Sequence, residues 1–61
     1  MTLEQAKAIL RDSTSGFWLD EGHVEGTLII DGELTVEELQ ALALIVTAEG
    51  VNFSLAEKVE A

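Results

Sequence analysis

The sequence contains no cysteine and a single histidine, His23. Without cysteine the chain can form neither a disulfide nor a thiolate zinc site, and one histidine cannot build a histidine-rich metal site. A domain of about 60 residues rarely gains more than about 3–5 kcal/mol from its core alone, and it is usually stabilised by disulfides, a metal or association. We therefore expect no metal, no cofactor, and a homo-oligomer or a bound partner protein.

Basic residues are scarce: three Lys and Arg stand against 12 Asp and Glu, and none lies between Arg11 and Lys58. The formal net charge is −9. Such a field repels phosphate backbones, which argues against direct nucleic-acid binding, and it attracts a basic surface on another protein. The acidity can also act only to keep a small protein in solution, and this alternative stays open.

Long apolar runs are also missing, since none approaches the about 20 residues that cross a bilayer. The start, "MTLEQAKAILRD", lacks the basic and then apolar pattern of a signal peptide. Hydrophobic residues nevertheless make up 48% of the chain, which is too many for a disordered acidic tail. We expect one folded cytoplasmic domain, residues 1–61, with no membrane contact.

The first segment predicts a surface helix. Thr2 and Gln5 have the spacing of a capping box, in which each side chain satisfies a free backbone N–H of the other. Leu3, Ala6 and Leu10 then share one apolar stripe, as in a helix that packs on a core through one side. The run from Ser13 to Gly16 ends this helix.

The segment "GFWLDEGHVEGTLIIDG" alternates as a β-hairpin does. A two-residue turn at Glu21-Gly22 would place Leu19 opposite Val24 and Phe17 opposite Gly26. In this register residues 28–31 extend beyond the first strand, so that their backbone groups lack a partner within the hairpin.

Alternation also places Trp18 and Ile29 on the hairpin face that points away from the core. An exposed tryptophan beside an apolar residue is a candidate for partner binding. We predict that this surface consists of Trp18, Ile29, Asp20, Glu21 and Glu25.

The stretch "DGELTVEEL" is similar to the second half of a calcium-binding EF-hand loop. If Asp31 is placed at loop position 5, position 3 is Ile29, which has no oxygen ligand to offer. A turn at Asp31-Gly32 followed by a second capping box of Thr35 and Glu38 accounts for the same letters.

The helix expected at about residues 36–49 is apolar on two sides. One stripe contains Val36, Leu39, Leu42, Ala43 and Val46. The opposite stripe contains Ala41, Leu44, Ile45 and Ala48. A helix that is apolar all round is buried all round, and a chain this short cannot easily supply two covering layers. We expect the second stripe to form a homo-oligomer interface, although the first helix and the C-terminal segment could cover it instead.

Gly50 fits a helix end. Val51 to Phe53 alternate like a strand, and the spacing of Ser54 and Glu57 fits a capping box, so residues 51–60 are open to either assignment. We expect an extended piece anchored by Phe53 and then a short helix. The predicted fold class is α+β: a helix, a β-hairpin and a helix, with a short C-terminal extended or helical segment.

Enzymatic chemistry is not indicated. His23 would face Asp20 across the predicted turn, but an exposed turn histidine near acids is common without catalysis. Ser13, Ser15 and Ser54 lack a nucleophile-elbow context, and no glycine-rich phosphate loop is present. We expect the chain to have no enzymatic activity.

The stretch "GHVEGTLIIDGELTVEELQALALIV", residues 22–46, resembles the small acidic accessory proteins that bacteriophages encode. This resemblance implies inhibition of a host or antiviral protein by binding, in the host cytoplasm. From the residues themselves we expect a protein-interaction module that inhibits or regulates a larger protein with a basic surface. Two alternatives stay open: an oligomer that sequesters a small molecule between its subunits, and a nucleic-acid mimic.

Overall fold

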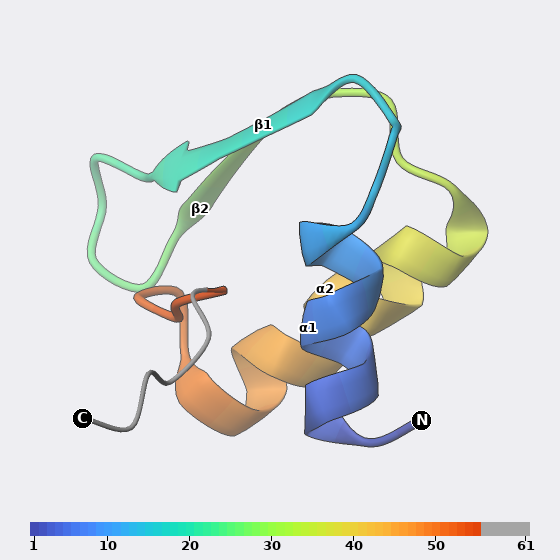
Figure 1. Cartoon of the computed structure of the whole chain (residues 1–61). Helices are drawn as coiled ribbons and strands as arrows, with labels where there is room; N and C mark the ends of the chain where they lie inside the picture. Colours follow the sequence, from blue (N-terminus) through green and yellow to red (C-terminus); the bar gives the residue numbers. More distant parts are fainter. Residues whose placement is uncertain (56–61) are drawn as a thin grey trace, which may run out of the picture.

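The computed structural model describes residues 1–55. The chain forms, in order, α1 (Leu3–Arg11), β1 (Phe17–Glu21), β2 (Leu28–Gly32) and α2 (Val36–Glu49). The two strands make one antiparallel hairpin, which arches over the two helices in Figure 1. The predicted α+β fold, with a hairpin between two helices, is confirmed. The short terminal helix that was expected after Ser54 lies mostly outside the described residues.

Both helices begin at the capping boxes that the sequence predicts. The Thr2 N–H donates to Gln5 Oε1 at 2.8 Å, and the Gln5 N–H donates to Thr2 Oγ1 at 3.1 Å. The same exchange joins Thr35 and Glu38 at the start of α2, at 2.8 and 3.1 Å. Each box satisfies backbone donors that a helix start otherwise leaves free, so these boundaries are set locally.

The core lies where α1 packs against α2. Its fully buried members are Ala6, Leu10, Ala41, Leu42 and Ile45. Two of the five are alanines, which allow two helices to approach closely because the side chains between them are small. Partly buried residues from the hairpin and from the segment after α2 surround this core, among them Phe17, Leu19, Leu28 and Phe53.

The prediction that the second stripe of α2 faces another chain is wrong for its central residues. Ala41 and Ile45 are both 0% exposed inside this chain, where α1 covers them. Leu44 is half-buried against the same core, and Ala48 is exposed. The alternative that α1 covers this stripe is therefore correct for Ala41 and Ile45. The exposed large apolar residues of α2 belong to the other stripe, where Val36 is 71% and Leu39 47% exposed.

The hairpin register also differs from the prediction. Phe17 lies opposite Gly32 and Leu19 opposite Ile30, so residues 28–31 are paired and do not overhang. Hydrogen bonds extend the ladder at both ends, from the Glu33 N–H to the Gly16 carbonyl at 2.9 Å and from the Gly22 N–H to the Thr27 carbonyl at 3.0 Å.

A longer loop at residues 23–26 replaces the expected two-residue turn. The Thr27 N–H donates to the Val24 carbonyl at 3.1 Å, and Gly26 has a φ of 80°. A positive φ at the third turn position favours glycine, whereas Glu-Gly is a poor two-residue turn. This loop lets residues 28–30, which include the β-branched Ile29 and Ile30, pair with Leu19 to Glu21, which the shorter turn would not allow.

After α2 the chain turns at Val51–Asn52 and runs back toward the loop end of the hairpin (Figure 1). Gly50 has a φ of 82° and a ψ of −176°, a positive-φ conformation but not the left-handed helical one. The expected extended piece at Val51 to Phe53 is thus replaced at its start by a turn. Phe53 does pack against the core as predicted, together with Leu55.

Ile45 is the largest fully buried side chain, so its truncation should remove much of the stability. We expect Ile45→Ala to lower the free energy of unfolding by about 2–5 kcal/mol and Ile45→Val by about 0.5–1.5 kcal/mol. The first figure is similar to the whole margin of a domain this small. Urea denaturation would measure both changes. Val36→Ala, at an exposed residue, is the control. An equal loss in its free energy of unfolding would contradict this account of the core.

Candidate functional site

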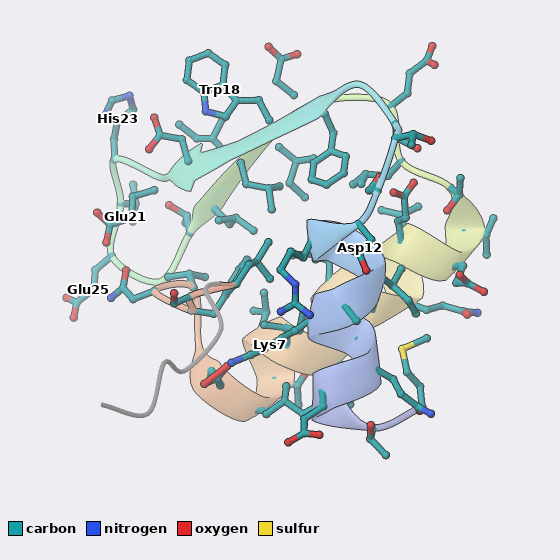
Figure 2. The ribbon with its side chains drawn as sticks, in the orientation of Figure 1. Lys7, Asp12, Trp18, Glu21, His23 and Glu25 are labelled. Carbon is teal, nitrogen blue, oxygen red and sulfur yellow. The ribbon has the colours of Figure 1, made fainter. Side chains whose placement is uncertain are left out.

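The hairpin presents one face entirely to solvent. Trp18 pairs with Asp31, and Asp20 pairs with Ile29, so these four alternating residues share the side away from the helices. Trp18 is 68% exposed and Ile29 40%, and both aspartates are exposed as well. Figure 2 shows the Trp18 ring pointing away from the helices. We call Trp18, Asp20, Ile29 and Asp31 the outer face.

The apolar and the acidic residues of the outer face lie on two crossing diagonals. Trp18 and Ile29 occupy one diagonal and Asp20 and Asp31 the other, because each aspartate lies opposite an apolar residue. Diagonal neighbours of this kind lie about 7–8 Å apart, within the reach of an aromatic ring. The apolar diagonal of Trp18 and Ile29 is thus bordered by a carboxylate on either side. This pattern suits a partner that offers an apolar side chain between basic ones.

The structure gathers part of the predicted binding set and separates the rest. Trp18, Asp20 and Ile29 lie together on the outer face as expected. The side chain of Glu21 alternates to the opposite face, and Glu25 lies in the loop, where Figure 2 shows both at the far end of the hairpin. Asp31, which the prediction omitted, belongs to the face.

The pairing of His23 with Asp20 is not formed, because Ile29 lies opposite Asp20. His23 is an exposed loop residue. Asp20 instead accepts a hydrogen bond at Oδ1 from the Glu21 N–H, at 2.8 Å. No group of three or more metal-binding side chains comes together within residues 1–55.

A groove of about 680 Å³ lies between the hairpin and the segment that follows α2. Its lining residues are Leu19, Asp20, Glu21, Leu28, Val51, Asn52, Phe53, Ser54 and Leu55. Leucine and phenylalanine residues supply the apolar part, and Asp20 and Glu21 are the acidic residues of the lining. Of these two, Glu21 has its side chain on the face of the hairpin opposite the outer face.

A cluster of polar side chains links the loop before β1 to the start of α2. Glu38 is only 5% exposed, and its carboxylate accepts hydrogen bonds from the Ser13 hydroxyl, the Ser15 hydroxyl at 2.6 Å and the Thr35 N–H at 2.8 Å. We call these four residues the Glu38 cluster. The hydrogen bonds, with that of Ser13 the largest cause, lower the pKa of Glu38 from 4.5 to about 2, against the opposing effect of its burial.

The Glu38 cluster ties the loop before β1 to the first turn of α2 across 23 and 25 positions in sequence. From the sequence only the capping role of Glu38 is predictable, and its bonds to the two serines are not. Ser13 and Ser15 were recognised as the end of a helix, and nothing in their spacing shows that both hydroxyls donate to the same carboxylate.

Comparison of the chain with protein-family models, with curated proteins and with solved structures gave no match. Within residues 1–55, neither helix has the length and apolar character needed to cross a membrane.

The lowered pKa of Glu38 predicts a pH dependence of stability. The ionised carboxylate stabilises the fold fully above its unfolded pKa of 4.5, and this contribution is lost as the pH falls through the folded pKa of about 2. Glu38→Gln should therefore be less stable than the unmodified protein at pH 7, and the difference should shrink toward pH 2. Urea midpoints across this range measure it, with the exposed Glu37→Gln as control. A difference that is the same at pH 7 and pH 2 would contradict the assignment.

Proposed function

We propose that the chain is a small protein-interaction module, and that its outer face binds a basic surface of a larger protein and so inhibits or regulates it. The exposed Trp18 on that face is the observation that carries the proposal. At 68% exposure most of a large apolar ring is in water, where it gains nothing for the fold. Tryptophans in such positions are typical anchors of binding interfaces.

The weak attachment of the hairpin supports the same proposal. Its two strands contact chiefly each other, as the two helices do. Besides Trp18 and Ile29 on the outer face, Ile30 on the other side is 48% exposed. A two-stranded hairpin is at best marginally stable by itself, so a partner that covers it would contribute both binding and order.

Charge defines the chemistry of the proposed partner. The net charge of −9 would draw in a basic surface from a distance, and Asp20 and Asp31 would pair with cationic side chains around the tryptophan. The apolar diagonal favours ordinary interface binding over nucleic-acid mimicry, because a mimic presents carboxylates rather than an aromatic ring. Inhibition by binding also agrees with the resemblance of residues 22–46 to small bacteriophage accessory proteins.

The groove favours one alternative, the sequestering of a small molecule. Its apolar lining and its acidic residues Asp20 and Glu21 suit an apolar or cationic compound rather than an anionic one. Heating the purified protein and analysing the released material by mass spectrometry separates the two functions. A stoichiometric compound would favour sequestering, and a stoichiometric protein captured from lysate would favour the interaction module.

Truncation of the anchor tests the module directly. Trp18→Ala should weaken binding of the captured protein by about 30-fold or more, as expected for a central interface residue. Val24→Ala is the matched control, because Val24 is 69% exposed but lies in the loop, away from the outer face. Surface plasmon resonance with the purified partner gives both affinities. Equal effects of the two changes would mean that the outer face is not the binding surface.

Salt should act mainly on the association rate. Raising the salt from about 0.1 M to 1 M shortens the Debye length from about 10 Å to about 3 Å, so long-range attraction is lost while short-range contacts persist. We expect the association rate to fall far more than the dissociation rate rises. Asp20→Asn with Asp31→Asn should reduce this dependence more than Glu4→Gln with Asp12→Asn, which removes the same charge from α1 and its end. An association rate that does not change with salt would mean that the acidic residues serve only to keep the protein in solution.

A further inference from the structure

We propose that α2 binds the α2 of a second copy through its exposed stripe, which we define as Val36, Leu39, Ala43 and Val46, in an antiparallel two-fold dimer. This interface is separate from the outer face of the hairpin. It also differs from the stripe that the sequence favoured, since α1 covers Ala41 and Ile45.

Exposure of the stripe is the first observation. Val36 and Leu39 are 71% and 47% exposed, Ala43 is exposed, and Val46 is half-buried at the edge of the core. This side of the helix contains the most exposed large aliphatic side chain of residues 1–55, Val36. A helix of a small domain normally turns such residues inward.

The distribution of charge favours a second copy of this chain as the partner of the exposed stripe. A two-fold interface brings each patch against itself, so any net charge in the patch is doubled across the contact. On a chain of net charge −9, the stripe and its exposed neighbours Gln40 and Thr47 carry no charge. The outer face of the hairpin contains Asp20 and Asp31, and two copies meeting there would bring carboxylates together.

The spacing of the stripe is the second observation. Its four residues follow one another at intervals of three, four and three positions, the pattern by which two helices pack side by side. This pattern reads the same in both directions along the helix. An antiparallel pair centred near Ala41 would therefore place Val36 against Val46 of the second copy, and Leu39 against Ala43.

The residue types fit this antiparallel register. Leu39 is the largest member and would meet Ala43, the smallest, so that a large side chain fills the space that a small one leaves. The Thr47 hydroxyl already donates to the Ala43 carbonyl at 2.7 Å, so its burial at the border of the contact leaves no free donor. A polar group that is already bonded can be covered at little cost.

Electrostatics at the helix ends favour the antiparallel arrangement over the parallel one. A parallel pair would bring the first-turn acids Glu37 and Glu38 of both copies near each other. The antiparallel pair places those turns against the partner's last turn, where Glu49 is already paired with Lys7. Antiparallel helix dipoles also attract each other, whereas parallel ones repel.

Sedimentation of the whole chain tests the dimer. The stripe spans the eleven residues from Val36 to Val46, about 15 Å of helix, which is short for an interface, so we expect a reversible dimer that forms at about 0.1–1 mM. Leu39→Glu and Ala43→Glu should each leave a folded monomer across this range, because both sites are exposed. Ile29→Glu is the matched control: it adds the same charge at a similarly exposed aliphatic residue, and it should leave the dimer intact.

Introduced cysteines test the register, since the natural chain has none to interfere. When Leu39→Cys and Ala43→Cys chains are mixed and oxidised, the disulfide between positions 39 and 43 should exceed either homodimeric disulfide. A parallel pair would give the homodimeric disulfides instead and would overturn the proposal. A protein that is still monomeric at about 1 mM, or a control variant that dissociates as fully as Leu39→Glu, would also overturn it. Neither result bears on binding through Trp18, which the capture experiment measures separately.

Discussion

Ala6 and Ala41 are both fully buried where α1 meets α2, and their small side chains allow the two helices to pack closely around Ile45. Within residues 1–55 the fully buried apolar side chains form this one cluster, and the hairpin and the segment after α2 are held at its border. The hairpin is attached by partly buried side chains and by the Glu38 cluster, so its outer face is left to solvent.

Glu38 shows how one side chain can do two structural tasks. As a capping residue it fixes the start of α2, and as an acceptor for Ser13 and Ser15 it also fixes the loop that leads into β1. Three hydrogen bonds, from the Ser13 and Ser15 hydroxyls and the Thr35 N–H, compensate the carboxylate for the water that it loses on burial. The position of the hairpin relative to α2 therefore depends on a group that is charged at neutral pH.

Features that depend on neighbouring residues were predictable from the sequence, and those that depend on choosing between distant surfaces were not. The two capping boxes and the outward position of Trp18 follow from local spacing, and all three are confirmed. The hairpin register was wrong because two loops of different length both keep Trp18 and Ile29 on one face. The sequence favours the wrong stripe of α2 as the uncovered one, because both stripes are apolar and only the position of α1 decides which of them is buried.

The separation of the outer face from the core has a consequence for how such a chain can evolve. Trp18, Asp20, Ile29 and Asp31 lie on a surface that contributes little to folding, so substitutions there are scarcely constrained by stability. Ala6, Ala41 and Ile45 allow almost no change, because larger residues would separate the helices and smaller ones would leave a cavity. Substitutions can thus accumulate on the outer face while the core beneath it is inherited intact.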